Sequence, residues 1–117
     1  MGKLTTHVLD TANGCPGAGI RVELYQCHPD GSRLIRDSRT NHDGRCERPL
    51  LDETEIHTGT WELVFHTADY FRAQGNLLDD PPFLDRITLR FAIADSSRHF
   101  HVPLLVSPWS YSTYRGS

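Results

Sequence analysis

The run 98–106 carries two histidines in a pattern typical of a half-buried strand. Alternate side chains of a strand point to opposite faces, so His99, His101, Pro103 and Leu105 share one face. On the other face, Phe100, Val102, Leu104 and Val106 predict a core. The histidine face is too apolar for free water and too polar for a core. We therefore expect a partner or a ligand to cover it.

A third histidine, His7, lies in a similar run at 4–10, where it shares a face with Thr5 and Leu9. An imidazole has an unperturbed pKa near ~6.5, so it is largely neutral at cytosolic pH and can accept a proton. The spacing of His99 and His101 could also start a zinc site. No further ligands lie nearby in the sequence, so we predict neither a metal nor another cofactor.

The elements that would position these side chains are strands separated by turn residues, which is typical of an all-β sandwich or barrel. One segment, Thr67 to Gly75, differs because Thr67 can cap a helix and Gly75 suits the position after its end. Pro29-Asp30-Gly31 predicts a hairpin. The strands are expected at 4–10, 20–28, 33–39, 46–50, 60–67, 86–94, 98–106 and 109–115.

Composition excludes several classes of protein. The chain has 117 residues, 38% of them hydrophobic and 23% charged, with a formal net charge of -3, so one globular domain over 1–117 is expected and a nucleic-acid partner is not. Three separated cysteines predict no disulfide framework. No stretch approaches a membrane span, and the start of the chain does not resemble a secretion signal. We expect a soluble, cytoplasmic protein without a membrane partner.

Motifs over most of the chain resemble those of the 5-hydroxyisourate hydrolases, the enzyme branch of the transthyretin-like proteins. The tail is the most specific of them, since transthyretin, a hormone carrier, shares the first part of that run but lacks its Tyr-Arg-Gly-Ser ending and the strand histidines. The matching motifs are THVLD at 6–10, NGCP at 13–16, TNHDGR at 40–45, HFHVPLL at 99–105 and SPWSYSTYRGS at 107–117.

This resemblance implies a β-sandwich of two four-stranded sheets with one short helix, assembled as a homotetramer that is a dimer of dimers. The implied activity is hydrolysis of 5-hydroxyisourate to 2-oxo-4-hydroxy-4-carboxy-5-ureidoimidazoline in urate degradation, in a channel between dimers. The implied functional residues are His7, Arg45, His101 and Tyr114, with Arg115, Gly116 and Ser117 completing the tail motif.

These residue types suit the addition of water to an amide carbonyl, which needs a base for the proton of water and donors for the developing oxyanion. Either His7 or His101 can be the base. Arg45 offers a planar fork of donors for an oxygen-rich substrate, and Tyr114 can hold the ring by stacking or hydrogen bonding. Arg48 is the alternative to Arg45; Arg45 is preferred because it follows Asp-Gly.

Two other classes of function stay open. A carrier could bind a small aromatic ligand in the same channel without turnover, and the polar histidines and arginine argue against it. A β-sandwich interaction module would have no small-molecule site, and a stable monomer would favour it.

Overall fold

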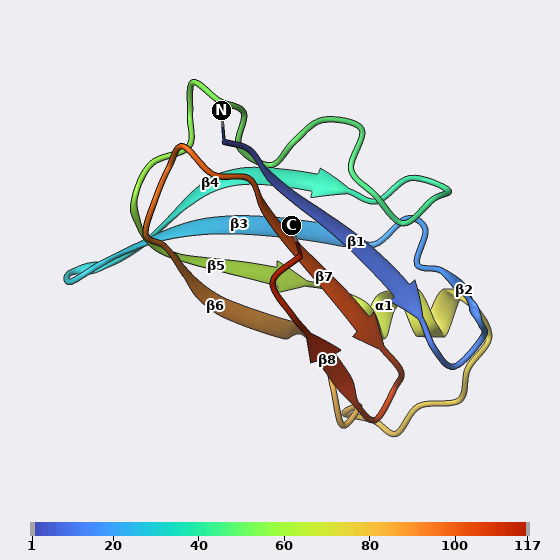
Figure 1. Ribbon diagram of the computed structural model, residues 1–117. Helices are drawn as coiled ribbons and strands as arrows, with labels where there is room; N and C mark the ends of the chain where they lie inside the picture. The colour runs from blue at the N-terminus through green and yellow to red at the C-terminus, as the bar shows by residue number, and fades with distance from the viewer. Residues whose placement is uncertain (1, 117) are drawn as a thin grey trace.

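The computed structural model describes residues 2–116, and within them it contains eight strands and one short helix (Figure 1). The elements are β1 (Leu4–Asp10), β2 (Cys15–Pro16), β3 (Arg21–His28), β4 (Gly31–Arg39), β5 (Gly59–Phe65), α1 (Thr67–Ala73), β6 (Ile87–Ile93), β7 (Phe100–Val106) and β8 (Tyr111–Thr113).

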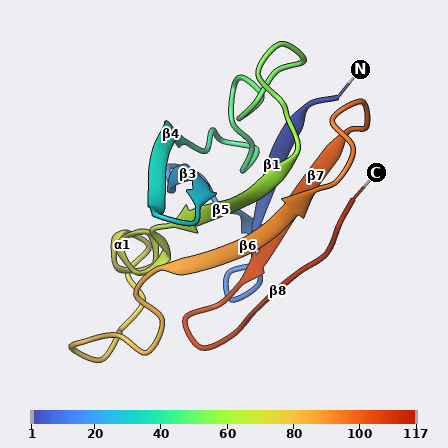
Figure 2. The same cartoon turned by 90° about the vertical axis from the view of Figure 1, so that its left-hand side faces the viewer.

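The strands form two four-stranded sheets packed face to face, with strand orders β2-β1-β7-β8 and β4-β3-β5-β6 (Figures 1 and 2). All neighbouring pairs are antiparallel except β1 and β7, which run parallel. The first and seventh strands are therefore central neighbours although 96 positions separate Leu4 from its partner Phe100. This architecture confirms the predicted β-sandwich with one helix.

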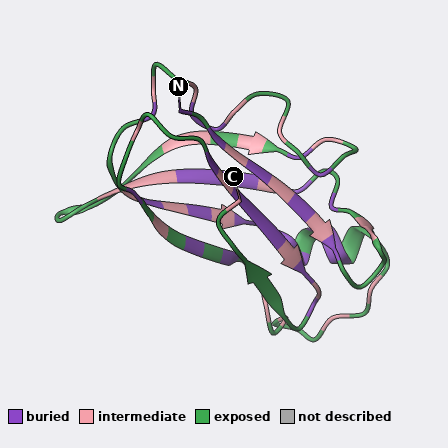
Figure 3. Ribbon diagram, in the orientation of Figure 1, coloured by how far each residue is buried: buried purple, intermediate pink, exposed green. Residues whose placement is uncertain are grey.

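Burial alternates along the central strands, as the sequence pattern predicts (Figure 3). In β7 the residues Phe100, Val102 and Leu104 are buried in the core, while His101 and Leu105 on the opposite face are half-buried. Trp61, Phe65 and other large side chains of the second sheet fill the space between the layers. The histidine face is thus the outer face of the β2-β1-β7-β8 sheet.

The prediction of a strand at 46–50 is wrong. The structure instead contains a two-residue strand that was not predicted, β2. The segment still follows one edge of β1, because the Leu4 N–H donates to the Leu51 carbonyl at 2.9 Å and Leu50 donates to the Leu4 carbonyl at 2.8 Å. Pro49 has no backbone N–H and interrupts a regular ladder here. The segment therefore touches β1 through isolated bridges at Arg45 and Leu51.

The predicted hairpin and helix both form, with one difference at the start of the helix. His28 pairs with Gly31 at the tip of the β3–β4 hairpin. Gly75 has a φ of 88° and its N–H donates to the Arg72 carbonyl, as expected for the residue that ends a helix. The predicted cap at Thr67 is wrong: Thr67 is the first helical residue, and His66 precedes it without a capping side-chain hydrogen bond.

No helix among residues 2–116 is long and apolar enough to cross a membrane.

Candidate functional site

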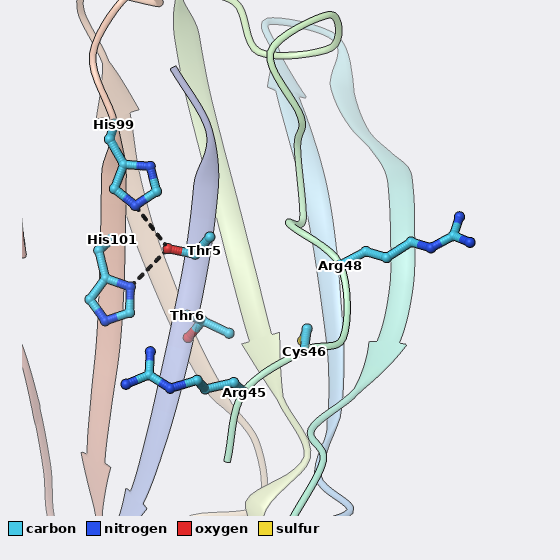
Figure 4. A pocket seen from close by; sticks show the side chains of 7 residues that line it. All are labelled: Thr5, Thr6, Arg45, Cys46, Arg48, His99 and His101. Carbon is cyan, nitrogen blue, oxygen red and sulfur yellow. Dashed lines mark hydrogen bonds between the residues drawn. The ribbon is translucent and has the colours of Figure 1, made fainter. Parts of the chain in front are cut away.

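A hollow of about 370 Å³ lies against β1 and β7, within the size range of small-molecule sites (Figure 4). Both strands and the loop after β4 contribute to it. Its lining residues are Thr5, Thr6, Arg45, Cys46, Arg48, His99 and His101.

The parallel register of β1 and β7 brings Thr5 opposite His101. The Thr5 hydroxyl lies 2.9 Å from Nδ1 of His101 and 3.2 Å from Nε2 of His99 (Figure 4). Each contact is within hydrogen-bond distance. The Nε2 atom of His101 has no hydrogen-bond partner among the described residues, so it is available to a ligand.

His7 is held by the loop that follows β4. Its Nε2 donates a hydrogen bond to the Asp43 carbonyl at 2.9 Å. A carbonyl only accepts, so the neutral His7 ring carries its proton on Nε2 and has an acceptor at Nδ1. The backbone of His7 also forms a bridge with Arg45, which places this arginine directly beside β1.

Gly44 allows the loop to approach β1 this closely. Its φ is 76°, and a Cβ there would come within 2.3 Å of the Val8 carbonyl oxygen. The Val8 N–H donates to the Gly44 carbonyl at 2.8 Å. A side chain at this position would push the loop, and with it Arg45, away from the strand.

The two arginines of this loop point in different directions (Figure 4). The Arg45 side chain extends across the β1 strand towards His101, whereas the Arg48 side chain extends away from the histidines. Both arginines line the hollow, and Arg45 is the one that points towards His101.

His101 is kept neutral by its surroundings. Burial of the ring is the largest cause that lowers the pKa of His101 below the usual imidazole value. Positive charge on Arg45 and on the histidines His7 and His99 acts in the same direction. A neutral imidazole near pH 7 can accept a proton from water.

Tyr114 and Arg115 do not line this hollow. They border a separate groove of about 480 Å³ between β6 and β8, where the Arg115 guanidinium lies 4.1 Å from the centre of the Phe100 ring. Tyr114 is 60% exposed. The structure thus separates these two predicted residues from His7, Arg45 and His101. Ser117, also predicted, lies outside the described residues.

Gly116 brings the tail back to the histidines. Its N–H donates to the His101 carbonyl at 2.7 Å, and a Cβ at this position would come within 2.8 Å of the His101 ring. Between this contact and the β7–β8 ladder lies Pro103, which has no backbone N–H to donate. The ladder covers only Leu104 to Val106, so Pro103 interrupts no hydrogen bond with β8.

Sequence reasoning missed Thr5 as a partner of the histidines. The sequence did indicate that Thr5 lies on the same face of its strand as His7. It could not indicate that Thr5 lies opposite His101, because that pairing depends on the parallel register of β1 with β7. Residues 2–116 contain no group of three histidine, cysteine or acidic side chains arranged to hold a metal ion. The Cys46 thiol lines the hollow, and burial raises its pKa, which disfavours a reactive thiolate.

Three comparisons relate this chain to known proteins. The family model described as HIUase/Transthyretin matches residues 4–116. A 5-hydroxyisourate hydrolase of Pseudomonas aeruginosa is 56% identical over 117 residues, which are 100% of this chain and 93% of that protein. Among solved structures, (S)-allantoin synthase has a TM-score of 0.93 at 47% identity, covering 99% of this chain and 44% of that one. Sea bream transthyretin in complex with thyroxine has a TM-score of 0.86 at 27% identity, covering 97% and 94%. The chain therefore belongs to the HIUase/Transthyretin family, which confirms the resemblance seen in its motifs.

Proposed function

We propose that this chain hydrolyses 5-hydroxyisourate. The observation that carries the proposal is that His101 and Arg45 line one hollow, with the outward nitrogen of His101 unpartnered among residues 2–116. His7 does not line the hollow itself but pairs with Arg45 beside it. The names of the curated relatives support an enzyme with this substrate over a carrier. The expected product is 2-oxo-4-hydroxy-4-carboxy-5-ureidoimidazoline.

His101 is the general base of this reaction. Its Nε2 takes a proton from water while the water oxygen bonds to a ring amide carbonyl of the substrate. The carbon–nitrogen bond of that amide then breaks, and the departing nitrogen takes the proton back from the imidazolium. The carbonyl carbon becomes a carboxylic acid, which releases its remaining proton to solvent and leaves the new carboxylate.

Arg45 and His7 assist this step by contacting the substrate. The Arg45 guanidinium donates hydrogen bonds to the oxygen that becomes negatively charged when water adds. His7, fixed by the Asp43 carbonyl, presents Nδ1 as an acceptor for a substrate N–H or O–H. Tyr114, Arg115 and Ser117 remain in the proposal as tail residues that bind substrate.

The active assembly is proposed to be a homotetramer whose second dimer covers the outer face of β1 and β7. Leu9 and Leu105 on this face are only half-buried in the single chain, which leaves apolar surface beside the histidines. A Leu105→Glu variant should dissociate in analytical ultracentrifugation and lose activity with its histidines intact. A fully active monomer would contradict the tetramer.

The single hydrolase domain over residues 1–117 and its cytoplasmic setting likewise remain predictions.

The activity test uses 5-hydroxyisourate generated freshly from urate, whose ultraviolet absorbance is followed with and without protein. Wild type should accelerate its decay, and His101→Ala and His7→Ala should lower the rate about 10²- to 10⁴-fold. His28→Ala, at the exposed β3–β4 hairpin far from the hollow, is the matched control and should keep wild-type activity. Decay no faster than the spontaneous rate, or wild-type rates in both site variants, would refute the proposal. Binding without turnover would favour the carrier.

A further inference from the structure

We propose that Thr5 is a positioning residue that couples the protonation of His99 to the tautomer of His101. Through this coupling, His101 presents an unprotonated Nε2 to the hollow mainly while His99 is neutral. The inference rests on the proposed function, in which His101 is the base, and it adds a control on when that base is available.

The geometry is a chain of two hydrogen bonds through a single hydroxyl. Thr5 Oγ1 lies 2.9 Å from Nδ1 of His101 and 3.2 Å from Nε2 of His99 (Figure 4). A hydroxyl has one proton to donate, so Thr5 can donate to only one ring at a time. When it donates to one ring, its oxygen can accept from the N–H of the other.

The two possible directions of this chain leave His101 in different states. If Thr5 donates to His99, it accepts from Nδ1–H of His101, whose Nε2 is then a free base. If His99 is protonated, its Nε2–H donates to Thr5, and Thr5 donates to Nδ1 of His101. The neutral His101 ring then carries its proton on Nε2 and cannot accept another there.

A third arrangement, in which Thr5 accepts from both rings, is disfavoured. The Thr5 hydroxyl has no other hydrogen-bond partner among residues 2–116, so its own proton would have no acceptor within the chain. That arrangement makes the same number of hydrogen bonds within the chain, but it directs two N–H donors at one oxygen and leaves the hydroxyl proton without a protein acceptor. Protonation of His99 therefore shifts His101 towards the inactive tautomer.

Rotation of the His101 ring does not replace the proton shift, because the hydrogen bond with Thr5 favours one orientation of the ring. A Cβ on Gly116 would come within 2.8 Å of Cδ2 of this ring, so the space there fits only a glycine. A ring flip would exchange Nδ1 for Cδ2 and break the hydrogen bond with Thr5. Gly116 and Thr5 thus hold opposite edges of one imidazole.

The charged groups around His101 favour its neutral form. His101 is faced by Arg45 from the loop, His7 from β1 and His99 from the position just before β7, and after burial these charges lower its pKa. His99 is exposed and shares a second hollow with Arg98 and Arg115. His101 is therefore held neutral, which leaves it a tautomer that can switch.

The direct test is ¹⁵N NMR of uniformly labelled protein, because protonated and unprotonated ring nitrogens have well-separated chemical shifts. In wild type at high pH, Nδ1 of His101 should be protonated, and it should lose that proton to Nε2 as His99 titrates. Thr5→Val should abolish this response, whereas Thr5→Ser should retain it. An unchanged His101 tautomer across the His99 titration would overturn the inference.

The kinetic test uses the acid limb of the kcat profile. Thr5→Val should lower kcat about 10-fold above neutral pH, the size of one hydrogen bond, with KM changed less than about twofold. His99→Gln should move the acid limb to lower pH, and so should Thr5→Val, which keeps the charge of His99. The double variant should move it no further. Additive shifts, or an unmoved limb in Thr5→Val, would contradict coupling through the hydroxyl.

Two controls distinguish a failure of this inference from a failure of the proposed hydrolase function. Thr11→Val removes another β1-proximal hydroxyl, which donates to the Val106 carbonyl at 3.1 Å, and should leave kcat and its pH profile unchanged. A wild-type protein without hydrolase activity would refute the proposed function, yet the NMR titration would still decide whether Thr5 couples the two rings.

Discussion

The two ends of strand β1 carry polar clusters that differ in one respect. At the end of the strand, Asp10 is buried, and its carboxylate accepts from the Ala12 and Asn13 N–H groups at 2.9 Å each. It also accepts from the Asn13 amide and the Tyr70 hydroxyl at 2.7 Å each. Near the start of the strand, the cluster of Thr5 and the histidines faces a hollow and leaves His101 Nε2 unpartnered within residues 2–116.

The difference separates a structural use of polar groups from a chemical one. A buried carboxylate with every oxygen satisfied ties the β1–β2 turn to helix α1 and has no capacity for a ligand. An imidazole with one nitrogen anchored and the other free is fixed in place and can still react. Changes at the histidine end should therefore reduce activity with little effect on stability, and changes at the Asp10 end should do the reverse.

Apart from the two histidines, the largest effect is expected at Arg45. Arg45→Met should lower kcat/KM about 10²- to 10³-fold, because the charge that stabilises the developing oxyanion is lost. Its free energy of unfolding should change by less than about 0.5 kcal/mol, since Arg45 is exposed. Progress curves with fresh substrate and urea unfolding at one protein concentration measure the two quantities.

Arg48→Met is the matched control for this prediction. The Arg48 side chain points away from the histidines, so its removal should change kcat/KM by less than about threefold. The reverse result, with a large loss only in Arg48→Met, would transfer the catalytic role to Arg48 and contradict the direction of the side chains in Figure 4.

A smaller effect, on stability alone, is expected at Asp10. Asp10→Asn places an amide donor where two donors already converge, so the free energy of unfolding should fall by about 2 to 3 kcal/mol. Activity per folded molecule should match wild type. Urea unfolding at fixed protein concentration measures the loss, and a variant as stable as wild type would show that this cluster does not stabilise the fold.

The pH dependence of this loss follows from the pKa of Asp10. Burial raises it, but the hydrogen bonds from Asn13, Tyr70 and the backbone together outweigh burial and leave it below the usual value. Because the pKa of Asp10 is lower in the folded state than in the unfolded chain, the ionised carboxylate stabilises the fold at any pH above its unfolded pKa of about 3.9. This stabilisation disappears as the pH falls through the pKa of the folded state. The difference between wild type and Asp10→Asn should therefore shrink below about pH 4.

The contrast between the two clusters also explains how far the sequence could predict the site. Alternation along β7 correctly placed His101 on an outer face because strand geometry fixes the facing of each residue. The partner of His101 could not be found in this way, since the contact with Thr5 depends on the parallel register of two strands 96 positions apart. Periodicity describes a single strand and carries no information about register.

The fold itself was largely predictable, and its one wrong strand has a local cause. The apolar and polar residues at 46–50 fit a strand, but Pro49 prevents a continuous ladder and leaves isolated bridges. The position of the tail was also beyond the sequence. Tyr114 and Arg115 lie in a different groove from His101 because only Gly116 returns to β7 after the β8 ladder ends.

The smallest expected effect is at Tyr70, and it tests whether the Asp10 cluster acts as a unit. Tyr70→Phe removes one of four close donors to the Asp10 carboxylate and keeps the edge-to-face contact with Phe71, whose ring centre is 5.1 Å away. The free energy of unfolding should fall by about 1 to 1.5 kcal/mol, with no change in activity. Because one donor is lost, the pKa of Asp10 should rise, and acid destabilisation should begin at a higher pH than in wild type. In the Asp10→Asn background the same substitution should cost less, since the charged acceptor is already absent, and a strictly additive cycle would show that the two residues stabilise the fold independently.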